Sequence, residues 1–180
     1  MLQITIPATE LWDERKQEFV YAKEQTLQLE HSLVSLRKWE SKWCKPFLSK
    51  DKKTDEEILD YIKCMTLTQN VKPDTYFRLT AENIRAIDQY INAPMTATTF
   101  SQDKNAKRSR EIVTAEVIYY WMFSLQIPLE CQKWHLNQLM TLIRVFNAKN
   151  APSKKRSKRD TWRQYEALNA ARRKQLNSKG

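Results

Sequence analysis

The chain opens with a short stretch in which apolar and polar residues alternate. Leu2, Ile4 and Ile6 alternate with polar residues until Pro7 ends the run. A period of two residues is typical of a β-strand that buries one face. Two further candidate strands lie at residues 18–22 and 26–30, so the pattern predicts a small antiparallel meander or hairpin within roughly residues 2–30.

Beyond residue 31 the apolar residues recur at intervals of three and four, which predicts helices. We expect about five of them between residues 32 and 148, separated by Pro46, Pro94, Pro128 and polar linkers. The predicted helices cover roughly residues 32–43, 54–65, 80–93, 114–125 and 130–147.

Two of these helices carry more specific signals. Thr54 and Glu57 have the spacing of a capping box, in which each side chain bonds the backbone N–H of the other residue. The helix at 130–147 is apolar over more than half of its circumference, and we expect it to pack on several sides as the central helix of the body.

The basic residues are concentrated at the end of the chain. Lys and Arg number 31 against 21 Asp and Glu, a net charge of +10. Ten basic and two acidic residues, a net charge of +8, lie from residue 151 onward, which leaves +2 for the first 150. A nearly neutral body with a basic arm suggests that the arm meets an acidic partner, either nucleic acid or protein.

Together these patterns predict a mostly helical α+β protein with two parts. Residues 1–150 form a compact helical body with a short N-terminal antiparallel β meander or hairpin. Residues 151–180 form a basic linker and an amphipathic C-terminal helix from about residue 159 to 176. The longest apolar run, residues 117–123, is far shorter than the roughly 20 residues that cross a bilayer, so we expect no membrane association.

The composition excludes several classes of enzyme. The chain has one glycine, Gly180, so it cannot form a phosphate-binding loop, a dinucleotide fingerprint or a nucleophile elbow, all of which need glycine backbone. The acidic residues at 55–60 fall in a first helical turn, where the helix dipole already favours them. We therefore expect no enzymatic activity and no cofactor.

The cysteines and histidines offer weak alternatives. Cys131 and His135 are four residues apart on a predicted helix and could share a metal, but their simpler interpretation is a small buried filler and a hydrogen-bonded core residue. Cys44 and Cys64 have no paired spacing, and we interpret all three cysteines as reduced thiols. We expect no metal site.

Aromatic residues mark two candidate partner-binding segments. Trp39 and Trp43 lie on the helix at 32–43, where core packing is the commoner role. Trp162 and Tyr165 lie among basic residues of the last helix, which could bind an acidic helix or a phosphate backbone, or could be a solvated tail. The candidate partner-binding residues are Trp39, Trp43, Lys155, Arg159, Trp162, Arg163, Tyr165, Arg172 and Arg173.

Four segments of the chain resemble those of a group of bacteriophage proteins, the tail assembly chaperones. The segments are residues 35–43, 94–100, 118–137 and 167–177, and the likeness extends over nearly the whole chain. None of them is a catalytic signature.

The resemblance implies a small, mostly helical protein in the cytoplasm of the infected bacterium. Such a chaperone binds the long helical tape-measure protein, or another phage tail protein, while the tail assembles. Two alternatives remain open: a nucleic-acid-binding phage regulator that uses residues 154–174, and a phage-encoded inhibitor that binds a host defence protein. The sequence does not indicate an oligomeric state.

Overall fold

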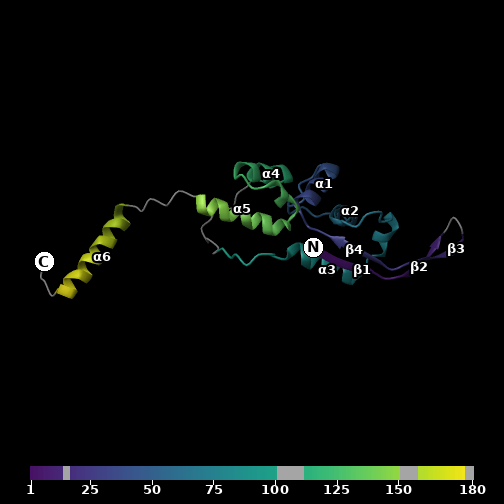
Figure 1. Cartoon of the computed structure of the whole chain (residues 1–180), viewed down its shortest axis with the longest axis horizontal. Helices are drawn as coiled ribbons and strands as arrows, with labels where there is room; N and C mark the ends of the chain where they lie inside the picture. Colours follow the sequence, from purple (N-terminus) through teal and green to yellow (C-terminus); the bar gives the residue numbers. More distant parts are fainter. Residues whose placement is uncertain (14–16, 101–111, 151–157, 177–180) are drawn as a thin grey trace. The chain divides into compact units, whose positions relative to one another are not determined.

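A computed structural model describes residues 1–13, 17–100, 112–150 and 158–176 (Figure 1). The chain divides into two compact units, Met1–Phe146 and Asn147–Gly180, and the division falls inside a helix. The first unit holds the strands and most of the helices, and the second holds the C-terminal helix. The expected mostly helical α+β fold is confirmed.

The strands form one long antiparallel ribbon made of two ladders. β1 (Leu2–Ile6) pairs with β4 (Gln25–Leu29), and β2 (Thr9–Asp13) pairs with β3 (Glu18–Ala22). Leu2 faces Leu29 and Thr9 faces Ala22, so the same register continues through both ladders. Pairing is interrupted at residues 7–8 and 23–24, where Pro7 has no N–H to donate. The ribbon is therefore a single hairpin with a break in its middle.

The sequence predicted three of these strands and missed β2. The segment Thr9–Asp13 follows a proline, and its apolar residues Leu11 and Trp12 are adjacent rather than alternating. No period-two pattern marks such a segment, and its strand conformation comes from pairing with β3.

Six α-helices and two short 3-10 helices follow the strands in the described part of the chain. They are α1 (Leu33–Trp43), α2 (Asp55–Met65), η1 (Pro73–Arg78), α3 (Ala81–Asn92), α4 (Ala115–Ser124), η2 (Leu129–Lys133), α5 (Leu136–Asn150) and α6 (Lys158–Leu176). Capping boxes begin three of them, with Ser32, Thr54 and Thr80 as the cap residues. The predicted Thr54–Glu57 box is confirmed, since each side chain bonds the other residue's N–H.

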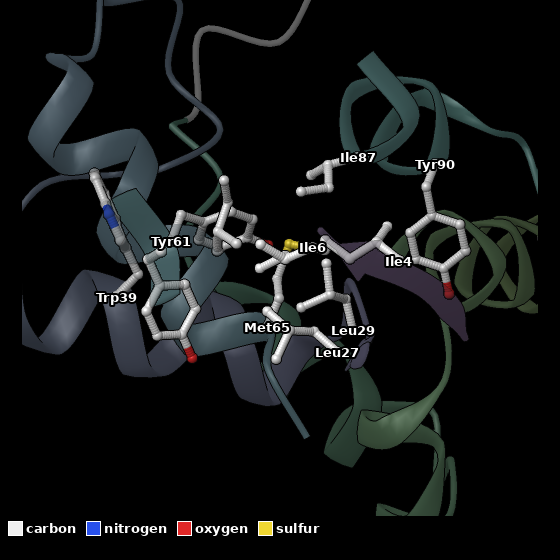
Figure 2. Packing of buried hydrophobic residues seen from close by; sticks show 11 residues of the cluster. Ile4, Ile6, Leu27, Leu29, Trp39, Tyr61, Met65, Ile87 and Tyr90 are labelled. Atoms are coloured by element: carbon white, nitrogen blue, oxygen red, sulfur yellow. The ribbon is translucent and has the colours of Figure 1, made fainter. Parts of the chain in front are cut away.

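The core of the first unit consists of two clusters, and α1 contributes to both. The ribbon, α2 and α3 enclose one cluster, in which the inward residues of β1 and β4 pack against Trp39, Tyr61 and Ile87 (Figure 2). The other lies between α1, α4 and α5 and includes Leu36 and Leu139. The alternating apolar residues of β1 and β4 therefore bury one face of the inner part of the ribbon, the β1–β4 ladder.

A buried carboxylate links three segments of the first unit. Glu40 of α1 is 7% exposed, and its oxygens accept hydrogen bonds from the backbone N–H groups of Phe47 (2.8 Å) and Ala115 (2.7 Å). Ala115 begins α4, whose N-cap residue Thr114 makes no side-chain capping bond. Glu40 therefore caps α4 from another helix, which satisfies a donor at the positive end of the helix dipole.

The predicted helix at 130–147 is wrong in its first part. The chain forms η2 and then an extended step at His135, where an isolated β-bridge joins it to Ser32, so α5 begins only at Leu136. Within α5 only Leu136, Leu139 and Ile143 are fully buried. Among the described helices, none is long and apolar enough to span a membrane.

Candidate partner-binding surfaces

The two tryptophans of α1 lie inside the first unit or at its rim. Trp39 is 1% exposed, and its indole N–H donates to the Glu57 carbonyl at 2.8 Å. Trp43 is half-buried, and its indole N–H donates to the Asp60 carboxylate at 3.0 Å. Both indole N–H groups hydrogen-bond residues of α2, so both side chains connect α1 to α2. A partner could reach Trp39 only if this core opened.

The acidic residues at the start of α2 also have structural partners. Lys42 pairs with Asp60, and Lys45 pairs with Glu57 at 2.5 Å. The hydrogen bond from Lys45, followed by that from the Thr54 N–H, holds the pKa of the Glu57 carboxyl below its usual value. No group of three or more potential metal ligands occurs among the residues that the structure describes.

The thiols and imidazoles do not form an activated nucleophile in the described part of the chain. Burial raises the pKa of the thiols of Cys64 and Cys131, which favours the unreactive protonated form. His31 bonds the Tyr61 hydroxyl, and His135 bonds the Tyr90 carbonyl. Both histidines therefore have structural partners, and no thiol bonds to either of them among the contacts described.

The C-terminal helix α6 is the most exposed element of the described chain. Every α6 residue whose burial is described is exposed, including Trp162 (67%), Tyr165 (62%) and Leu168 (47%). At 3.6 residues per turn, these three and Leu176 lie within an arc of about 120°. Within the second unit, no described residue covers this apolar stripe.

A basic edge runs beside the apolar stripe. Helical spacing places Arg159, Arg163, Arg173 and Lys174 within the adjacent arc of about 100°. Arg172 falls within the stripe itself, between Tyr165 and Leu168. The helix holds six basic and two acidic residues, a net charge of +4. The structure thus gathers the predicted residues of the arm on one helix, except Lys155, which lies outside the described residues.

The outer half of the ribbon is a second exposed surface, and the sequence did not reveal it. Trp12 of β2 and Phe19 of β3 face each other across the ladder, with ring centroids 4.9 Å apart. Phe19 is 69% exposed, and Tyr21 and Val20 beside it are also exposed. A cluster of large apolar side chains on the surface is typical of an interaction site. The cross-strand pairing that creates it depends on β2, which carries no sequence signal of its own.

One arginine stabilises the position of this outer hairpin. Its terminal guanidinium nitrogen donates to the carbonyls of Pro7 (2.7 Å) and Lys23 (3.0 Å), which lie at the break between the two ladders. The arginine is Arg78, the last residue of η1. It therefore replaces bonds that the interrupted ladder does not make.

No protein-family model, curated protein sequence or solved structure matches this chain.

Proposed function

We propose that this protein is a non-catalytic assembly chaperone of the phage-tail type, with α6 as the element that binds its client. The client implied by the sequence resemblance is the tape-measure protein, and the site of action is the cytoplasm of the infected host. The observation that carries the proposal is the apolar stripe of α6, which no described residue of the second unit covers and which is made of Trp162, Tyr165, Leu168 and Leu176.

Such a stripe is suited to a helical client. An amphipathic helix binds a second helix through apolar residues spaced three and four apart, which interdigitate with the same spacing on its partner. Trp162 and Tyr165 offer large rigid rings, which dominate the energetics of protein interfaces. A long coiled-coil protein exposes repeated stripes of this kind before it is enclosed by other subunits.

The basic edge of α6 adds selectivity. Arg159, Arg163 and Arg173 lie beside the apolar stripe and can pair with acidic residues at the flanks of a client helix. Exposed ion pairs are screened by salt, so they favour a complex that can dissociate. Release matters for a chaperone because the client must pass on to the growing tail.

Co-expression with the tape-measure protein of the same phage tests the proposal. The wild-type protein should co-elute with that client in size-exclusion chromatography. The triple variant W162A/Y165A/L168A should bind at least about 100-fold more weakly, since hot-spot truncations cost about 2 kcal/mol or more each. The control variant Ala167→Ser changes the opposite face of α6 and should bind normally. Separate elution of the wild-type protein, or equal binding by both variants, would refute the proposal.

A second candidate function is nucleic-acid binding through α6, favoured by the net charge of +4 on this helix. Lys and Arg displace counterions from phosphates, so log K should fall with log salt by about 0.9 for each phosphate neutralised on duplex DNA. Deleting residues 151–180 should abolish this binding and leave the first unit folded. A flat salt dependence, or binding retained after the deletion, would exclude this function.

A further inference from the structure

Two buried histidines meet where the two core clusters join. His31 follows β4 and His135 precedes α5, and their rings lie edge to face with centroids 5.1 Å apart. They are 2% and 5% exposed. The backbone N–H of Leu136 donates to the His31 carbonyl at 2.7 Å, so both backbone and rings connect these segments.

The hydrogen bonds of His135 require a neutral ring. Its Nδ1 accepts from the backbone N–H of Asn137 at 3.3 Å, and its Nε2 lies 3.0 Å from the Tyr90 carbonyl, to which it can only donate. One nitrogen is thus an acceptor and the other a donor, which describes one neutral tautomer. A second proton on Nδ1 would face the Asn137 N–H and break that bond.

This neutral ring helps to hold the end of α3. Helix α3 ends at Asn92, where the last carbonyls need partners. His135 bonds the Tyr90 carbonyl, and the Asn137 side-chain amide donates to the carbonyls of Ile91 (2.9 Å) and Ala93 (2.8 Å). The segment 135–137 therefore caps the C-terminus of α3 and joins it to α5.

The groups around the histidines give little compensation for a positive charge at His31. The Tyr61 hydroxyl of α2 is 2.6 Å from its Nδ1, and His135 is its other ring neighbour. Burial, with His135 as a second cause, lowers the pKa of His31 to about 4. The pKa of His135 is also lowered, first by burial, although its bond to the Tyr90 carbonyl opposes the shift.

The nearest carboxylate already has partners. Glu30 accepts from the Tyr90 hydroxyl at 2.7 Å and pairs with the N-terminal ammonium of Met1 at 3.0 Å. Met1, Glu30, Lys133 and His135 all line one open cavity of about 330 Å³. Water can reach His135 through this cavity. The Met1 ammonium opposes part of the attraction of Glu30 for a protonated His135 ring.

We propose that the His31–His135 pair is an acid-operated latch, whose protonation releases the C-terminal end of α3 from the start of α5. The proton binds Nδ1 of His135, which removes the acceptor of the Asn137 N–H and places a cation against His31. The protonated ring can still donate to the Tyr90 carbonyl, so the cap opens because the buried cation beside His31 moves to solvent and withdraws residues 135–137 from the Ile91 and Ala93 carbonyls. The apolar clusters on either side contain no titrating histidine, so they stay packed at mildly acidic pH.

Amide hydrogen exchange of the full chain at pH 7.5 and pH 5.0, corrected for intrinsic rates, tests the latch. Protection at the Ala93, Leu136 and Asn137 amides should fall about tenfold or more at pH 5.0, because the open state binds the proton more tightly. The Leu27 and Ile118 amides of the two cores should keep their protection. The proposal would be overturned if the Ala93, Leu136 and Asn137 amides were equally protected at both pH values. It would also be overturned if the Leu27 and Ile118 amides lost as much protection at pH 5.0 as these three do.

The variant His135→Gln provides the matched control. The glutamine amide can still donate to the Tyr90 carbonyl but does not titrate, so the pH dependence of protection at Ala93 and Leu136 should shrink to the part that His31 alone contributes. A pH dependence as large as in the wild-type protein would refute the role of His135. If the variant does not fold, the imidazole resonances of the wild-type protein give the answer: the latch requires both rings to titrate below pH 6, and a value of 6.5 or above contradicts it.

Discussion

Replacing Glu40 should show how strongly one buried carboxylate supports the fold. In Glu40→Gln the side chain keeps its size but only one oxygen, so one of the two N–H groups at Phe47 and Ala115 faces an amide NH2. A buried donor left unpaired, together with the loss of a charge-assisted bond, costs about 2 to 3 kcal/mol. Glu40→Ala leaves both N–H groups unpaired and should cost about 4 kcal/mol.

Urea unfolding followed by far-ultraviolet circular dichroism measures this loss. With a urea slope of about 2 kcal/mol per molar, the midpoint for Glu40→Gln should fall by about 1 to 1.5 M. The matched control is Glu24→Gln, which removes the same charge at an exposed position and should change the free energy of unfolding by less than about 0.5 kcal/mol. If Glu40→Gln unfolds at the same midpoint as this control, the capping role assigned to Glu40 is wrong.

Three further predictions concern other contacts of the first unit. Burial opposes ionisation of Asp60, but the bonds from Lys42 and Trp43 outweigh it and hold the pKa of its carboxyl below the ordinary value. The stability that the ionised Asp60 contributes should be present above about pH 4 and be lost as the pH falls further. Urea midpoints between pH 3 and 7 should show this loss in the wild-type protein and not in Asp60→Asn. Arg78→Ala should destabilise the protein by about 1 to 3 kcal/mol and speed amide exchange throughout β2 and β3, because the Pro7 and Lys23 carbonyls lose their donor. Unchanged exchange in these strands would contradict the role of Arg78 in positioning the outer hairpin. Phe19→Lys should change the free energy of unfolding by less than about 1 kcal/mol, because Phe19 is exposed, and a larger loss in thermal unfolding would mean that its ring is covered in solution.

Local chemistry explains why most helices could be predicted from the sequence. Thr54 and Thr80 begin helices because their hydroxyls accept from the amide three residues on, a contact within one turn that needs no tertiary partner. Pro46, Pro94 and Pro128 follow the helices that they were expected to end. Such signals depend on adjacent residues, so the sequence alone contains them.

The features that the sequence did not predict depend on contacts between distant residues. β2 is a strand because it pairs with β3, and α5 starts late because His135 bridges to Ser32, more than 100 residues away. Spacing alone did not separate the buried Trp39 from the exposed Trp162, since both belong to apolar stripes on helices, and only the basic residues around Trp162 distinguished them. Which stripe is covered is decided by the packing of α1 against α2.

The exposed pair of Trp12 and Phe19 shows the same limit for the candidate site. Trp12 lies in a segment that carries no strand signal, and only the register of the ribbon places it opposite Phe19 on the outer hairpin beyond the core. Conversely, the basic edge of α6 could be anticipated, because Arg159 and Arg163 lie one turn apart on a single helix.

The most direct test of the proposed function is the affinity of the purified protein for the proposed client, a phage tape-measure protein, measured by titration calorimetry at several salt concentrations. Binding through α6 predicts a negative heat-capacity change from apolar burial, a modest weakening with salt, and loss of binding in W162A/Y165A/L168A. The absence of any heat of binding with the wild-type protein, or full binding by the triple variant, would contradict the account.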